Sequence, residues 1–76
     1  MPTKTFTNVL VNQKHIKVEG DRATGAIIKE LGGIPAANLL FRESPGPKDD
    51  EAIADGAEVE LHNGDRFYDM PPGNFG

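Results

Sequence analysis

The first 35 residues constrain the fold most, because they combine a strand pair with a short helix in that order. Residues 3–12 are rich in Thr, Val, Phe and Leu, and residues 14–19 alternate between polar and apolar side chains. Both patterns are typical of strands. Asn12-Gln13 between them is short enough for a tight turn, and Asn tolerates the positive φ that such turns need. We therefore expect the chain to begin with a β-hairpin.

The two-residue turn also predicts a register for this hairpin. It places Val9 opposite Ile16 and Thr7 opposite Val18, on the face that packs on the core. A longer turn or a bulge would exchange the two faces. With the two-residue turn, the side chains left for the outer face are Phe6 and Leu10.

A short helix of about two turns is expected next, over residues 25–31. Thr24 is the better N-cap, because its hydroxyl can accept from amides of the first turn, and Asp21 is the competing candidate. Gly32-Gly33 supplies the left-handed residue that commonly ends a helix. Three apolar side chains follow helical spacing and are expected to face the core: Ile27, Ile28 and Leu31.

The middle of the chain predicts a strand followed by a loop. In the strand, residues 38–43, Leu39 and Phe41 share the inner face and Leu40 takes the outer one. Residues 43–51 mix charged side chains with Pro and Gly, which is typical of an exposed, mobile loop.

The next segments are short. Residues 52–56 are expected to form a helical or 3₁₀ turn that places Ile53 on the core. Residues 57–62 alternate clearly and predict a strand with Val59 and Leu61 inward.

Asn63-Gly64 is a strong turn dipeptide, after which residues 65–70 can extend and pair. Alternation then places one of Phe67 and Tyr68 in the core and the other outside. Residues 71–76 contain two prolines and two glycines, which disfavour both a helix and a central strand. The sequence therefore predicts a folded domain over residues 1–70 and a flexible C-terminal tail over residues 71–76.

Size and composition limit the classes of protein that fit. A chain of 76 residues without cysteine has one small core, no disulfide framework, no thiol nucleophile and no thiolate zinc site. Its formal charge of −4 argues against nonspecific nucleic-acid binding. No stretch approaches the roughly 20 apolar residues that span a bilayer. We expect a soluble, cytoplasmic, non-enzymatic protein without a cofactor, whose partners are proteins and not nucleic acid or membrane.

Sites for metals and phosphates also lack support. His15 and His62 are the only imidazoles, they have no ligand at a helical spacing, and both are expected on outward strand positions. Asp49-Asp50-Glu51 lacks the spacing of a calcium loop. Gly32-Gly33 follows a helix instead of preceding one, so it is not a phosphate-binding loop. We expect no metal site.

The order of elements predicts a two-layer α+β domain. One helix packed across a mixed sheet of four to five strands buries the apolar side chains of both layers. The third and last strands would join the hairpin through pairs distant in sequence. A hairpin followed by one helix and returning strands is the order of a β-grasp.

Several segments resemble ubiquitin-like proteins. Gly33-Ile34-Pro35 followed by Leu39-Leu40-Phe41 resembles the stretch of ubiquitin in which a helix ends in Gly-Ile-Pro before a strand. Residues 11–14, 20–25 and 64–68 resemble bacterial ubiquitin-like proteins of the multiubiquitin type. The resemblance extends from Lys4 to Tyr68. It implies a ubiquitin-like β-grasp that serves as a protein modifier.

This resemblance also implies a reactive residue and its partners. Gly76 would be activated by an E1-like adenylating enzyme, passed to an E2-like carrier and conjugated to target proteins, with a JAB-type metalloprotease in the same bacterial pathway. The chain departs from the family pattern in ending Asn-Phe-Gly, where ubiquitin and sulfur carriers end in two glycines. The tail residues that these enzymes would recognise are Pro71, Pro72, Gly73, Asn74 and Phe75.

A partner-binding surface comparable in placement to that of ubiquitin is expected on the outer strand faces. Its residues are Leu10, Leu40, His62 and Tyr68. A scatter of single exposed apolar residues is an equally good interpretation. Two other functions stay open: a noncovalent β-grasp adaptor that binds through a strand edge or the outer sheet face, and a sulfur carrier with a thiocarboxylate at Gly76. The absence of a terminal Gly pair counts against the sulfur carrier.

Overall fold

The structure is a computed structural model that describes residues 5–72, so residues 1–4 and 73–76 lie outside it. Within the described range it is a small α+β domain with one helix. The elements in chain order are β1 (Phe6–Val11), β2 (Lys14–Glu19), β3 (Arg22–Thr24), α1 (Gly25–Gly32), β4 (Leu39–Arg42), β5 (Glu51–Ile53), β6 (Glu58–Glu60) and β7 (Arg66–Met70). No helix in residues 5–72 is long and apolar enough to cross a membrane.

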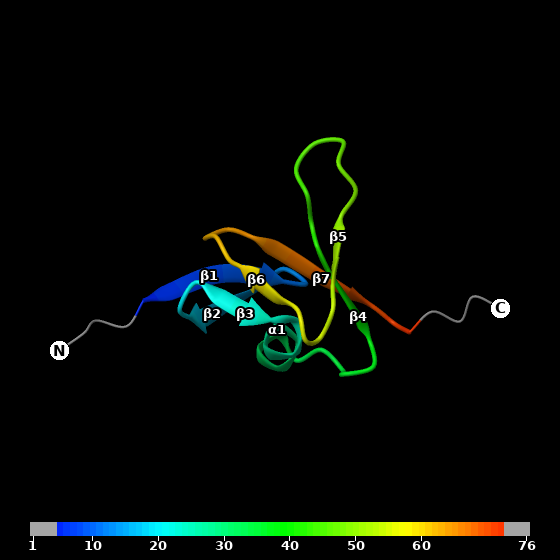
Figure 1. Ribbon diagram of the computed structural model, residues 1–76, viewed down its shortest axis with the longest axis horizontal. Coiled ribbons are helices and arrows are strands. Elements are labelled where there is room, and N and C mark those ends of the chain that lie inside the picture. The colour runs from blue at the N-terminus through cyan, green and yellow to red at the C-terminus, as the bar shows by residue number, and fades with distance from the viewer. Residues whose placement is uncertain (1–4, 73–76) are drawn as a thin grey trace.

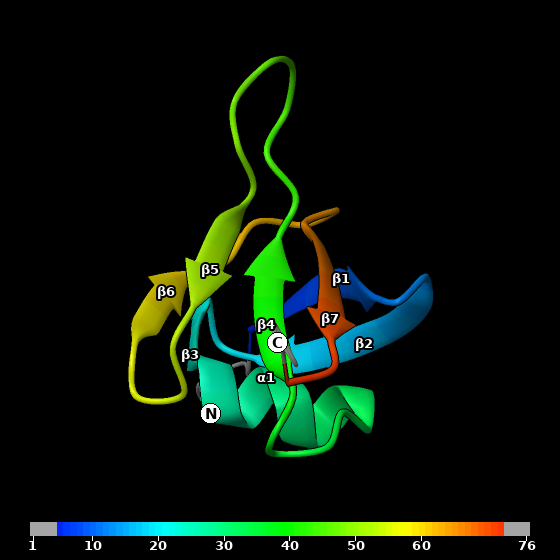
Figure 2. The same ribbon diagram turned by 90° about the vertical axis from the view of Figure 1, so that its right-hand side faces the viewer.

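Five strands form a mixed main sheet in the order β2-β1-β7-β4-β5. β1 and β7 run parallel at its centre, and the other neighbours run antiparallel. The remaining strands, β3 and β6, form a separate antiparallel pair. α1 crosses one face of the main sheet, and the β4–β5 connection projects from the body (Figures 1 and 2). This arrangement is compatible with a β-grasp.

The predicted hairpin and its register are confirmed. Val9 lies opposite Ile16 and Thr7 opposite Val18, and the turn residues Asn12 and Gln13 have φ values of 52° and 69°. Positive φ at both central turn positions matches the twist of the flanking strands. β7 joins this hairpin directly through β1, whereas β4 joins it only through β7.

The core lies between the main sheet and α1. Phe67 is buried and Tyr68 is half-buried, which confirms that one aromatic faces in and the other out. Leu61 is buried and Val59 packs against the core, as predicted. The largest fully buried side chains are Phe67, Ile28, Leu40, Val9 and Val11.

The ends of α1 are as predicted, but its inner face is not. The Thr24 hydroxyl accepts from the amide of Ile27 at 3.3 Å, and Gly33 ends the helix with a φ of 72°. Ile28 is buried, but Ile27 and Leu31 are 45% and 42% exposed. The prediction that all three apolar side chains face the core is therefore wrong.

The inner face of α1 instead carries Gly25, Ile28, Lys29 and Gly32, because the helix packs too closely for larger residues. A Cβ atom on Gly32 would lie 2.6 Å from Val11 Cγ1. Lys29 is only 7% exposed, and its ammonium group donates to the Ala36 carbonyl at 3.1 Å and pairs with Asp55 at 2.7 Å. These two partners satisfy a charge that burial would otherwise penalise.

The predicted faces of β4 are reversed. Leu40 is 1% exposed and Leu39 is 46% exposed. Leu40 lies opposite the buried Ile53 of β5, and Phe41 lies opposite Tyr68 of β7. Since neighbouring strands bury the even-numbered face of β4, the expected placement of Leu40 on the outside is wrong.

Two short strands replace other expected elements. Ala52 and Ile53 belong to β5, so the predicted helical turn over 52–56 is wrong, although Ile53 docks on the core as expected. The strand predicted over 57–62 is limited to β6, and it pairs with β3 instead of the main sheet. β3 occupies residues that the sequence predicted as the lead into the helix.

Candidate functional site

Exposed and half-buried apolar side chains gather on the face of the main sheet opposite α1. We call this set the outer-face patch: Leu10, Leu39, Phe41, Tyr68 and Met70. Each follows or precedes a buried residue of its strand, so strand alternation directs it away from the core. The Phe41 and Tyr68 rings stack with centroids 5.4 Å apart. The patch therefore has an aromatic pair across β4 and β7.

A shallow cavity of about 210 Å³ borders the patch. Leu10 and Tyr68 contribute its apolar wall. Its polar lining comes from Asn12, Gln13, Glu43 and Arg66. An apolar surface beside a few polar groups is the usual composition of a protein-binding site.

The structure brings together two of the four residues predicted for the partner surface. Leu10 and Tyr68 line the same cavity, but Leu40 lies in the core. His62 follows β6 and is exposed away from the patch, so its assignment to this surface is wrong. The residues that sequence reasoning missed are Leu39, Phe41 and Met70. Spacing of two from Tyr68 could have identified Met70.

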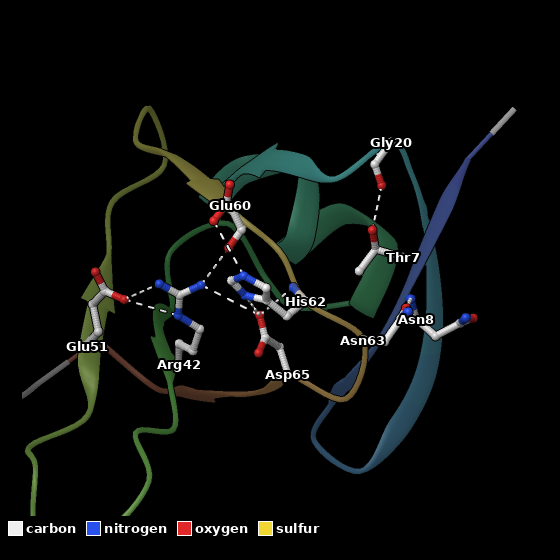
Figure 3. A network of polar contacts seen from close by, with 9 residues as sticks. All are labelled: Thr7, Asn8, Gly20, Arg42, Glu51, Glu60, His62, Asn63 and Asp65. Atoms are coloured by element: carbon white, nitrogen blue, oxygen red, sulfur yellow. Dashed lines mark hydrogen bonds and ion pairs between the residues drawn. The ribbon is translucent and has the colours of Figure 1, made fainter.

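His62 belongs to a polar network centred on Arg42 (Figure 3). The Arg42 guanidinium donates to the Glu60 carbonyl at 2.8 Å and to Glu51 through Nε at 3.1 Å. The His62 amide donates to the Asp65 carboxylate at 2.9 Å, and that carboxylate lies 3.7 Å from the guanidinium. The network holds β5 and the β6–β7 connection to β4, so its function is structural.

The projecting connection between β4 and β5, residues 43–50, is named the arm (Figures 1 and 2). At its base the Tyr68 hydroxyl donates to Asp50 at 2.6 Å, and the Ser44 amide donates to the other oxygen of that carboxylate at 2.9 Å. These bonds lower the pKa of Asp50, and the carboxylate raises the pKa of Tyr68. The arm is therefore attached to the outer-face patch.

The last strand ends in a second polar cluster. Asp69 accepts from the side-chain amides of Asn12 at 2.6 Å and Asn38 at 2.7 Å, one at each carboxylate oxygen. This carboxylate thus ties β7 to the β1–β2 turn and to the segment before β4. Pro71 and Pro72, which follow β7, are exposed, whereas Gly73, Asn74, Phe75 and Gly76 lie outside the described residues.

Asp69→Asn is expected to lower the free energy of unfolding by about 1–2 kcal/mol at pH 7, because the amide replaces one acceptor oxygen with a donor. The bonds from Asn38 and then Asn12 lower the pKa of Asp69, so its stabilisation is present above the unfolded pKa of about 3.9. It is lost as the pH falls further through the folded pKa. Urea titrations should show a difference between wild type and variant that narrows below about pH 4; a constant difference would contradict this assignment.

Other candidate chemistry is limited in the described part of the chain. No group of three or more His, Cys, Asp or Glu residues within 5–72 could hold a metal ion. His15 and His62 are both exposed, as expected. The chain matches no protein-family model, no curated protein and no solved structure. The outer-face patch and the Asp69 cluster are therefore the features on which a functional proposal rests.

Proposed function

We propose that the chain is a β-grasp domain that acts as a ubiquitin-like protein modifier. The observation that carries this proposal is the sheet order, in which the first and last strands lie parallel at the centre and α1 crosses the sheet. A hairpin, a helix and returning strands in this arrangement agree with the resemblance of residues 4–68 to ubiquitin-like proteins. β7 then directs the following residues away from the domain.

The proposed reactive group is the carboxylate of Gly76, exposed by processing if the chain continues beyond it. Its oxygen attacks the α-phosphorus of ATP in an E1-like enzyme, forming an acyl-adenylate and releasing pyrophosphate. A nucleophile of the carrier or target then displaces AMP. Absence of a Cβ atom at Gly76 leaves the carboxylate unhindered, and Pro71-Pro72 favours an extended tail. The Asp69 cluster fixes the point from which this tail leaves.

The outer-face patch is the proposed docking surface for the E1-like enzyme, the E2-like carrier and the JAB-type metalloprotease. Aromatic side chains such as Phe41 and Tyr68 are enriched among residues that dominate binding energy. Their stacking and the Tyr68 bond to Asp50 hold both rings in place before a partner arrives. Such preorganisation reduces the conformational entropy lost on binding.

The proposal is tested by incubating the protein with ATP and the E1-like enzyme of the same bacterium, followed by intact-mass measurement. The wild type should form an adenylate or a covalent adduct, and deletion of Gly76 should abolish both. Gly73→Ala is the matched control, because it changes the tail without removing the carboxylate from Gly76.

Other outcomes separate the remaining functions. A protein that never forms an adenylate, adduct or thiocarboxylate at Gly76 is not a modifier. If the deletion variant still binds its partner with unchanged affinity, the noncovalent adaptor is favoured. A terminal thiocarboxylate without conjugates indicates a sulfur carrier.

A further inference from the structure

β2 lies at one edge of the main sheet and has no further strand beside it among residues 5–72. The Gly20 amide donates to the Thr5 carbonyl at 2.6 Å, so even-numbered residues of β2 carry the hydrogen bonds to β1. In an antiparallel pair, the alternate residues direct their backbone groups the other way. The N–H and C=O groups of His15 and Lys17 therefore point outward along an open strand edge.

The helix beside this edge exposes two apolar side chains. Ile27 and Leu31 are one helical turn apart and are 45% and 42% exposed. Lys29 points from α1 toward Ala36 and Asp55, and residues two positions from it lie on nearly the opposite flank. α1 also contacts β2 and β3 and follows them across the same face (Figure 1). The Ile27–Leu31 flank therefore lies on the β2 side of the helix.

The charge of this edge differs from that of the whole chain. The first four residues of β2 include Lys14, His15 and Lys17, whereas the chain as a whole has a formal charge of −4. The Lys17 ammonium lies 5.2 Å from the centroid of the Phe6 ring, which holds it on the outer face. A strand edge with these bases attracts an acidic segment and repels a basic one.

We propose that the β2 edge binds an extended acidic segment of a partner protein by strand addition. The segment hydrogen-bonds to the backbone of His15 and Lys17, its aliphatic side chains cover Ile27 and Leu31, and its carboxylates lie near Lys14 and Lys17. Main-chain bonds supply affinity in this mode, and alternate side chains supply specificity. This site goes beyond the proposed modifier function, because it needs neither Gly76 nor the outer-face patch.

The test is an NMR titration of the ¹⁵N-labelled protein with two synthetic octapeptides. Both contain four consecutive Val and Ile residues; one is flanked by Asp and Glu, and the other by Lys. The acidic peptide should shift the amide signals of β2 and α1, slow hydrogen exchange at His15 and Lys17, and bind at least tenfold more tightly than the basic peptide. Raising the salt concentration should weaken the acidic peptide severalfold.

Variants separate backbone pairing from side-chain contacts. Lys17→Pro removes an outward N–H but no bond to β1, so it should abolish binding while the other amide signals persist. Ile27→Asp with Leu31→Asp should weaken binding at least tenfold. Leu39→Asp with Met70→Asp is the matched control, because these side chains are each 46% exposed on the opposite face, and it should leave affinity unchanged.

Three results would overturn the proposal. The first is no saturable shift with the acidic peptide at millimolar concentration, and the second is shifts confined to the outer-face patch. The third is full binding by a folded Lys17→Pro variant. Concentration-dependent shifts of the same β2 amides without peptide would instead identify a second copy of this chain as the occupant, and would equally contradict an acidic partner.

Discussion

Leu40→Ala is expected to lower the free energy of unfolding by about 3 kcal/mol, whereas Leu39→Ala should change it by less than about 0.5 kcal/mol. Leu40 is almost fully buried and lies opposite Ile53, so its truncation leaves a cavity between the sheet and α1. Leu39 occupies the adjacent position of the same strand with nearly half its surface exposed. The two substitutions remove the same atoms and differ only in the face of β4.

Urea denaturation followed by circular dichroism measures both changes. A chain of 76 residues has a small reserve of stability, so the Leu40 variant should be partly unfolded at 37 °C. Equal costs for the two variants would mean that β4 has no single inner face. A larger cost at Leu39 would restore the face assignment that the sequence suggested.

Gly25→Ala is the second substitution with a large expected effect. In an unobstructed helix alanine is better than glycine by about 1 kcal/mol. Here a Cβ atom at residue 25 would collide with the Ala54 carbonyl oxygen, which belongs to a backbone turn that cannot rotate away. The Gly25 amide also donates to the Ala57 carbonyl at 3.2 Å, and the Ala26 amide donates to the Asp55 carbonyl at 3.1 Å. Overpacking should therefore destabilise the protein by about 2–3 kcal/mol.

Gly56→Ala is the matched control for this prediction. It lies in the turn that meets the helix, but a Cβ atom there would have no neighbour within 4 Å. Its substitution should change the free energy of unfolding by less than about 0.5 kcal/mol. Thermal unfolding of the three proteins checks this. A stabilised Gly25→Ala variant would show that α1 can move away from the turn at little cost.

Local signals explain why the hairpin and the ends of α1 could be predicted. Asn12-Gln13 between two alternating segments determines a register, and Thr24 with Gly33 marks the two helix ends. These features depend on neighbours in sequence. The inner face of α1 depends instead on how closely it approaches Val11 and the turn after β5. Sequence spacing favours Ile27 and Leu31, while that approach favours the glycines.

The face of β4 and the candidate site were ambiguous for a similar reason. Leu39-Leu40-Phe41 is apolar at three consecutive positions, so alternation alone does not select a face. Its pairing with β5 and β7 decides the choice, and those strands are distant in sequence. Tyr68 and Leu10 could be predicted as outward because each has one clear inward neighbour. β3, β5 and β6 are three residues long, too short to show a period.

The central position of β7 has a consequence for synthesis of the protein. β2 and β1 form one half of the main sheet, β4 and β5 form the other, and in the sheet only β7 connects them. It also carries Phe67, the largest fully buried side chain. A nascent chain lacking residues 66–70 therefore cannot close its core on the ribosome. Folding has to wait until the strand that immediately precedes the tail has emerged, so an ordered domain reports that its last strand has been made.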